Sequence, residues 1–233
     1  MKLTILETGH VPEPLRDRFA PYPDMFATML ARTGADITTK TVNILAGQAL
    51  PDPADLEGVL ITGSPAGVYD DLPWMNPLRD FIRKAHGQTK MVGICFGHQI
   101  IADALGGEVR KSEKGWGLGR HRYLAGEGAK RLGLNGEAIS IACSHQDQVI
   151  VPPTDAEVIH ASEFTPNAGL LYRNGRTLSF QPHPEFADEY ALALIELRRG
   201  NAPEAVIEKA LGSMQAPSDS TAVASAIARF LSA

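Results

Sequence analysis

One of the chain's two cysteines, Cys95, lies in the pentapeptide GICFG, residues 93–97, whose small residues suit a sharp turn. An apolar run ends at Ile94 and a helix-like run begins near Gly97, so the cysteine separates an expected strand from an expected helix. A turn of this kind displays its side chain above the carboxyl edge of a sheet, as in a nucleophile elbow, and the helix N-terminus favours thiolate over thiol. The same pentapeptide also fits a small inert cysteine that packs beside the helix.

A nucleophilic cysteine needs a base, and the base needs an orienting partner. The segment FQPHPEF, residues 180–186, offers both. Prolines on either side of His183 fix the backbone around it, and Glu185 leaves from the same face of an extended segment. A carboxylate beside an imidazole sets its tautomer and stabilises the imidazolium. The sequence therefore predicts a Cys95–His183–Glu185 relay, with an ordinary surface turn as the alternative for the His-x-Glu pair.

The elements that would position these residues alternate between strand and helix through the first half of the chain. Apolar or alternating runs predict strands, and helical spacing of apolar residues predicts helices. The expected strands are residues 2–7, 35–43, 58–63 and 90–94, and the expected helices are residues 22–34, 76–87 and 98–107. This alternation predicts a parallel, doubly wound sheet, and such sheets bind ligands at the carboxyl ends of their strands.

After residue 107 the expected strands become shorter and are joined by turns. They comprise residues 138–144, 156–162, 168–173 and 176–181, followed by a helix over 187–200 and another from near Asp219. We expect a single flavodoxin-like, three-layer α/β domain with a mostly parallel central sheet and a smaller antiparallel extension. The main domain would span residues 1–200, and residues 201–233 would form a helical extension packed on it.

The composition is that of a globular protein, with 44% hydrophobic and 21% charged residues in a chain of 233. A net charge of −5 gives no basic footprint for nucleic acid or for an anionic membrane surface. No stretch approaches the roughly 18 apolar residues of a membrane span. Two cysteines are too few for a disulfide scaffold or a zinc site, so we expect a reducing, cytoplasmic location. The second cysteine, Cys143, lies in an apolar run and reads as an inert core thiol.

The glycine-rich segment KGWGLGRH, residues 114–121, has no clear place in this pattern. A phosphate-binding loop would need a buried strand before it and a helix after it, and neither is evident. We expect a loop at the rim of the active site instead. The small basic cluster of Lys114, Arg120 and Arg122 reads as part of a solvated loop.

Four motifs in sequence order resemble the class I glutamine amidotransferases. They are LITGSPAGVYD (60–70), GICFGHQIIADALGG (93–107), CSHQDQV (143–149) and FQPHPEF (180–186). The resemblance runs from about residue 3 to about residue 197. It is strongest to free-standing members that are similar to the amidotransferase domain of GMP synthetase.

The resemblance implies that Cys95 attacks the side-chain amide of glutamine. His183 would act as general base and acid, and Glu185 would orient it. A γ-glutamyl thioester forms, ammonia leaves with a proton from His183, and water then hydrolyses the thioester. Neither a metal nor an organic cofactor is needed, because the cysteine supplies the covalent chemistry.

The resemblance also implies an oxyanion hole and a substrate grip. The oxyanion would meet backbone N–H groups of Gly63 or Ser64 and of Phe96. The glutamine would be held by Gln99, Ser144, His145 and Gln146. Many relatives have glycine at position 146, so Gln146 leaves room for a substrate other than free glutamine. Ser64 also departs from a common glycine, but it keeps its N–H.

Three functions remain open at this point. The first is a glutaminase or amidotransferase whose ammonia feeds an acceptor on a separate synthetase subunit, since the chain has no P-loop motif. The second is a hydrolase of γ-glutamyl peptides or amides that uses the same triad. The third is a non-catalytic regulatory or binding protein, which the intact triad disfavours.

Overall fold

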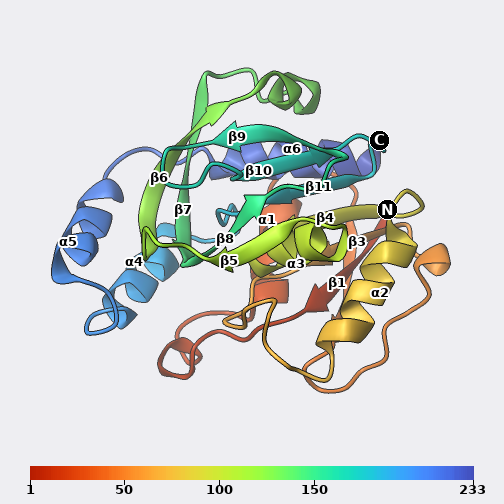
Figure 1. Cartoon of the computed structure of the whole chain (residues 1–233), viewed down its shortest axis with the longest axis horizontal. Coiled ribbons are helices and arrows are strands. Elements are labelled where there is room, and N and C mark those ends of the chain that lie inside the picture. Colours follow the sequence, from red (N-terminus) through yellow and green to blue (C-terminus); the bar gives the residue numbers. More distant parts are fainter.

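The computed structural model describes all residues, 1–233, and its central feature is a nine-stranded sheet (Figure 1). Five neighbouring strands run parallel; in sheet order they are β2 (Thr38–Asn43), β1 (Lys2–Glu7), β3 (Gly58–Ile61), β4 (Lys90–Ile94) and β11 (Thr177–Phe180). Four antiparallel neighbours continue the sheet: β10 (Gly169–Tyr172), β9 (Ala156–Ala161), β6 (Gly117–Ala125) and β7 (Ala138–His145). Because β4 pairs with β3 and β11, the carboxyl ends of these three strands meet at one edge.

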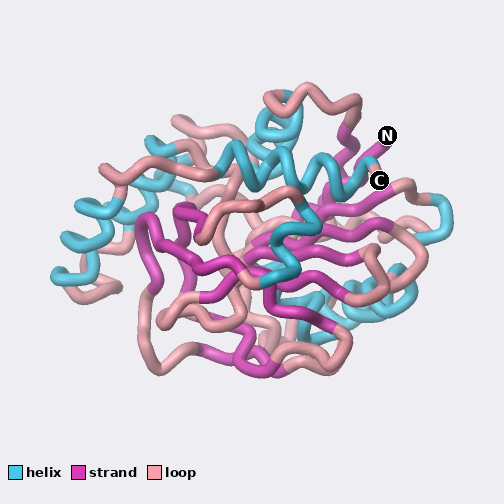
Figure 2. Tube along the Cα trace, turned by 90° about the horizontal axis from the view of Figure 1, so that it is seen from above, coloured by secondary structure: helices cyan, strands magenta, loops and turns pink.

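Helices cover both faces of the parallel strands, which gives three layers (Figures 1 and 2). On one face lie α1 (Tyr22–Ala31) and α6 (Ser220–Ser232), and on the other lie α2 (Met75–Ala85) and α3 (Phe96–Ala104). The strands alternate between these cores: on β4, Val92 and Ile94 face α1 and α6, whereas Met91 faces α2 and α3. Burial on both faces explains why the central strands β3 and β4 are almost continuously apolar, whereas the edge strand β2 is polar and mostly exposed.

The antiparallel end of the sheet carries its own helices and a small second sheet. The helices α4 (Asp188–Leu197) and α5 (Glu204–Ser213) pack on β6 and β7 and share a core with the segment before α1. Strands β5 (Glu108–Lys111) and β8 (Asp147–Val151) form an antiparallel pair beside α3. Short 3-10 helices complete the list: η1 (Glu13–Leu15), η2 (Pro53–Asp55) and η3 (Glu127–Leu132).

The predicted fold class is confirmed, since the chain forms an α/β domain with a mostly parallel central sheet and a small antiparallel sheet. Helix α6 supplies Ile227 and Leu231 to the core of the parallel strands, so the C-terminal segment packs on the same body. The boundary at residue 200 stays a prediction.

The prediction of a solvated loop around Lys114, Arg120 and Arg122 is wrong at its centre. Residues 117–125 form strand β6, where Arg120 is buried. Its guanidinium donates to the carbonyl oxygen of Met214 (2.9 Å) and is paired with Asp188. No strand is evident from the sequence here because glycines dominate the start of β6. Pairing with β7, the next strand, and with β9, together with packing against α5, stabilises it instead.

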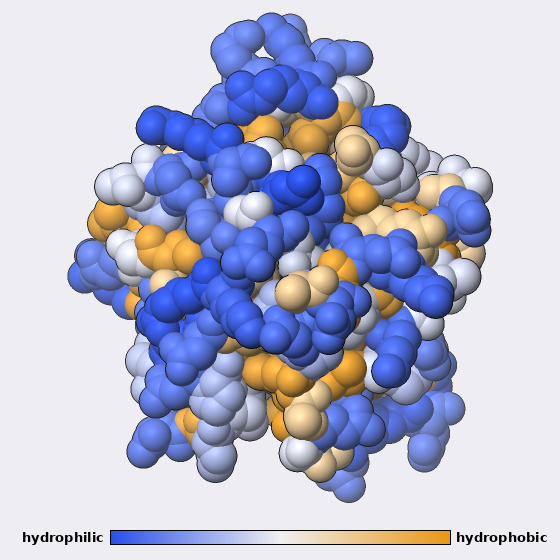
Figure 3. Space-filling view, turned by 90° about the vertical axis from the view of Figure 1, so that its right-hand side faces the viewer, coloured by the Kyte–Doolittle hydropathy of each residue, from blue (hydrophilic) through white to orange (hydrophobic).

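The face of the molecule drawn in Figure 3 is mostly hydrophilic, with hydrophobic residues exposed only in small areas between charged and polar ones. None of the helices combines the length and the apolar character that spanning a bilayer requires.

Candidate active site

Cys95 occupies the turn between β4 and α3 in a strained backbone conformation. Its φ is 54° and its ψ is −105°, and it is the only residue other than glycine with a positive φ. The Cys95 N–H donates to the carbonyl oxygen of Phe180 at the end of β11 (2.9 Å), and the Gly97 N–H donates to Thr62 O, just after β3 (3.1 Å). Neighbouring strand ends thus hold the cysteine in a conformation that costs about 1–3 kcal/mol.

The glycines on either side of the cysteine are required by close backbone approach. A Cβ atom at Gly93 would lie 2.4 Å from the carbonyl oxygen of Gly97, and one at Gly97 would lie 2.2 Å from that of Ile61. Both distances are far inside van der Waals contact, so a larger residue at either position would push α3 away from the sheet. The GICFG pentapeptide is therefore specific to this tight strand–helix turn.

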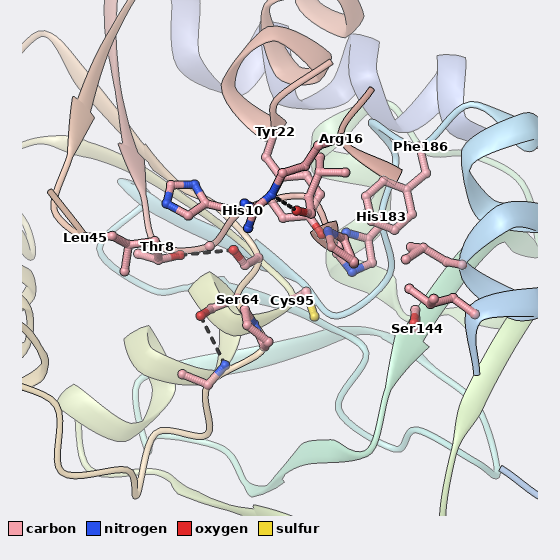
Figure 4. Close-up of a pocket in the computed structure, with 18 of the residues that line it drawn as sticks. Thr8, His10, Arg16, Tyr22, Leu45, Ser64, Cys95, Ser144, His183 and Phe186 are labelled. Carbon is pink, nitrogen blue, oxygen red and sulfur yellow. Dashed lines mark hydrogen bonds between the residues drawn. The ribbon is translucent and has the colours of Figure 1, made fainter. Parts of the chain in front are cut away.

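His183 follows β11 and faces Cys95 across the carboxyl edge of the sheet (Figure 4). Its backbone N–H donates to Ala142 O (2.9 Å), and its Nδ1 lies 2.7 Å from Oε1 of Glu185. Phe186 stacks on the imidazole, with ring centroids 3.9 Å apart and planes 8° apart. Three contacts therefore fix the ring and leave Nε2 for the cysteine.

The site favours a charged imidazole next to the sulfur. Burial by itself lowers the pKa of His183. The charges of Glu185 and Cys95, together with hydrogen bonds to both, outweigh burial and raise that pKa to about 10. Such an arrangement stabilises an imidazolium next to the sulfur at neutral pH.

The backbone donors expected at the oxyanion hole lie around the sulfur. A methyl group added at Gly63 would lie 3.7 Å from the Cβ of Cys95 and 3.1 Å from Cε1 of His183. Ser64 lies beside the cysteine in Figure 4, and Phe96 is the first residue of α3. The N–H groups of these residues make no hydrogen bond to another backbone or side-chain group of the chain.

Two pockets meet at Cys95. The first, which we call the polar pocket, has a volume of about 310 Å³ and holds all the residues expected to grip glutamine: Gln99, Ser144, His145 and Gln146. Gln99 is buried and donates to Asp147 O (2.8 Å) and to the side chain of Gln181 (3.0 Å). Burial lowers the pKa of His145 to about 3, so this ring is neutral in the site.

The second, which we call the apolar pocket, has a volume of about 540 Å³, and Figure 4 shows residues that line it. Ten of its 21 lining residues are hydrophobic, and most of them come from the N-terminal loop, the segment before α2 and helix α4. Tyr22, Trp74 and Phe186 provide aromatic walls. Six residues belong to both pockets: Ser64, Pro65, Ala66, Cys95, Ser144 and Arg198.

Sequence reasoning did not identify two residues of the site. Phe186 directly follows Glu185, and its position beside a predicted catalytic histidine was the available signal. Arg198, which lines both pockets, carries no sequence signal because it resembles the adjacent Arg199. The glycine-rich segment 114–121 does reach the rim as expected, through Trp116, although most of it is strand β6.

Comparison with known proteins agrees with the geometry. The sequence model of the family "Glutamine amidotransferase class-I" matches residues 16–191. That is well over half of the chain. The chain belongs to the class-I glutamine amidotransferase family.

Several relatives match either most of the chain or about two thirds of it. A glutamine amidotransferase-like protein of Schizosaccharomyces pombe is 28% identical, with 91% of each chain covered. Gamma-glutamyl peptidase 3 of Arabidopsis thaliana is 31% identical over 66% of this chain and 65% of its own. The glutamine-hydrolysing GMP synthase of Thermus thermophilus is 33% identical over 70% of this chain, which corresponds to only 34% of that longer protein.

A solved structure shows the same fold. The glutamine amidotransferase of Methylobacillus flagellatus superposes with a TM-score of 0.78 at 22% identity, covering 99% of this chain and 92% of that one. The family match ends at residue 191, so Arg198, α5 and α6 lie beyond it. The resemblance expected from the sequence motifs is thereby confirmed at the level of family and fold.

Proposed function

We propose that this chain hydrolyses the γ-amide bond of glutamine or of a related γ-glutamyl compound, with Cys95 as nucleophile. One observation carries the proposal. Cys95 is held in a strained turn facing a buried His183, whose other ring nitrogen lies 2.7 Å from Glu185. A structural cysteine requires neither the strain nor the oriented imidazole, whereas a nucleophile requires both.

The proposed reaction begins with attack of the Cys95 thiolate on the γ-carbonyl carbon. The tetrahedral intermediate collapses with cleavage of the C–N bond, and the amine takes a proton from the His183 imidazolium as it leaves. Neutral His183 then accepts a proton from water, which attacks the thioester carbon. Glutamate is released and the thiolate is regenerated, so atoms and charges balance over the cycle.

The developing oxyanion would meet N–H groups of Phe96 and of Ser64 or Gly63. Donors aimed at developing charge are worth about 3–4 kcal/mol each. The glutamyl end would occupy the polar pocket, among Gln99, Ser144, His145 and Gln146. There, Asp70 and Asp147 suit an α-ammonium group, and Lys111 suits an α-carboxylate.

Two forms of this activity differ only in the leaving group. With free glutamine, ammonia is released and would be delivered to an acceptor on a separate synthetase subunit. With a γ-glutamyl peptide or amide, a larger amine is released. The apolar pocket favours the second form, since ammonia would occupy little of its roughly 540 Å³. A relative whose name is gamma-glutamyl peptidase supports it as well.

The proposal is tested by incubating the purified protein with glutamine and with γ-glutamyl peptides while ammonia, free glutamate and released amines are measured. We expect turnover, and rapid labelling of Cys95 by a glutamine-like electrophile. Absence of both would leave a binding or regulatory protein on this fold.

A further inference from the structure

The two pockets that meet at Cys95 differ in charge. The polar pocket holds both signs, with Asp70, Asp147, Lys111 and Arg198, which it shares with the apolar pocket. The apolar pocket contains two arginines, Arg16 and Arg198, and no aspartate or glutamate lines it. In a chain with a net charge of −5, an apolar cavity that has arginines but no carboxylates in its lining suits an anion with an apolar body.

Arg198 is the more informative of these arginines because it has no acceptor in the chain. Its guanidinium forms no hydrogen bond or ion pair, and its Nε is buried without a partner. It lies over the ring of Trp116, a residue of the polar pocket, 4.5 Å from the centroid, which holds the side chain where the two pockets meet. The adjacent Arg199 pairs with three glutamates. A half-buried cation without a counter-charge is costly unless a ligand supplies one.

Arg16 contributes from the opposite element, the segment after η1. Its Nε donates to Val11 O (2.9 Å), which holds the side chain against the pocket and leaves the terminal nitrogens without a partner in the chain. Leu194 and Leu197 of α4, next to Arg198, add an aliphatic wall. A carboxylate and an apolar side chain could therefore be bound in the same cavity.

We propose that the apolar pocket is a leaving-group site and that Arg198, assisted by Arg16, binds a carboxylate on the departing amine. The preferred substrates are then γ-glutamyl derivatives of amino acids with apolar side chains. This inference rests on the proposed hydrolysis, and the bonds made and broken are the same: the departing amino acid takes its proton from His183, and water hydrolyses the thioester. The α-carboxylate of the glutamyl group would bind in the polar pocket, where Lys111 supplies a positive charge.

The test compares γ-glutamyl-leucine with γ-glutamyl-leucinamide, which has the same shape but no leaving-group carboxylate, and with glutamine. We expect kcat/KM of the unmodified protein to be about 10- to 100-fold higher for the carboxylate, as for one charge-assisted pair. Arg198→Gln should bring the two values together by lowering only the first. Arg122→Gln removes an exposed arginine of β6 outside both pockets and should change neither.

Equal kcat/KM for the acid and the amide in the unmodified protein would overturn the inference while leaving the hydrolysis intact. An equal loss on all three substrates in Arg198→Gln would also overturn it, since it would place Arg198 on the glutamyl carboxylate. A second readout does not need turnover. Leucine, but not leucinamide, should slow alkylation of Cys95 by iodoacetamide, and this protection should disappear in Arg198→Gln. If no substrate were hydrolysed but leucine still protected Cys95, the proposed hydrolysis would be wrong and the carboxylate site would stand.

Discussion

The turn that carries Cys95 and the strand that carries Cys143 place the same residue type in opposite chemical settings. Both side chains are buried. Cys95 lies at the strained start of α3, at the junction of two pockets, beside a charged imidazole. Cys143 lies within β7, opposite Gly119 of β6, in regular extended backbone.

Electrostatics separates the two cysteines as well. Burial raises the pKa of the Cys143 thiol to about 12. Cys143 is therefore a neutral thiol at physiological pH. Burial alone thus does not identify a reactive cysteine. Backbone conformation and an oriented base distinguish the two sites.

The largest expected difference is in turnover after removal of each sulfur. Cys95→Ala should reduce kcat by about 10⁴-fold or more, because the covalent step is lost. Cys143→Ala, the matched control, should retain turnover within about threefold. Both variants should be measured by glutamate release and checked for folding by circular dichroism. Activity retained in folded Cys95→Ala, or lost in folded Cys143→Ala, would reverse the roles assigned to the two cysteines.

The sequence was enough to single out Cys95 as the proposed nucleophile of this pair, although not to predict all of its surroundings. The glycines of GICFG and the prolines around His183 are local signals of local geometry, so the turn and the displayed histidine could be predicted. The position of Arg198 at the two pockets and the burial of Arg120 depend on contacts between segments that are distant in the sequence. No local pattern encodes those contacts, and the prediction for β6 failed for the same reason.

The second largest expected effect is the loss of kcat when the Glu185 carboxylate, which has no counterpart at Cys143, is removed. Glu185→Gln should lower kcat by about 10²- to 10⁴-fold, because the imidazolium loses its partner. Its effect on stability should depend on pH. The pKa of His183 is raised in the folded state above its unfolded value, so this interaction stabilises the fold fully below about pH 6.5 and is lost as the pH rises towards 10.

Urea unfolding at pH 6, 8 and 10 measures this dependence. The free energy of unfolding of Glu185→Gln should fall below that of the unmodified protein by about 3 kcal/mol at pH 6, and by clearly less at pH 10. Glu189→Gln, on the exposed side of α4, is the control and should give a small, pH-independent difference. A deficit that grew with pH would contradict the assignment of the charged pair.

The position of the His183 imidazole relative to the Cys95 sulfur should be sensitive to a single added methyl group. In Gly63→Ala the new Cβ would lie 3.1 Å from Cε1 of His183, so the ring must shift by a few tenths of an ångström. We expect kcat to fall by about 10- to 100-fold, because small displacements of a catalytic group are costly. Gly212→Ala places its methyl group in open space and should leave kcat unchanged. Unaltered kcat in Gly63→Ala would show that Gly63 is not close to the reacting groups.

The smallest expected effect tests the backbone difference between the two cysteines directly. A protein with glycine inside a helix or strand normally has a free energy of unfolding about 0.5–1 kcal/mol lower than the same protein with alanine there. At Cys95 the order should be inverted, because φ of 54° and ψ of −105° strain any residue with a Cβ atom. The free energy of unfolding in urea titrations should therefore be about 1 kcal/mol higher for Cys95→Gly than for Cys95→Ala. It should be lower for Cys143→Gly than for Cys143→Ala, since β7 is regular. If the two positions gave the same order, the turn would not store the strain that separates a displayed cysteine from a packed one.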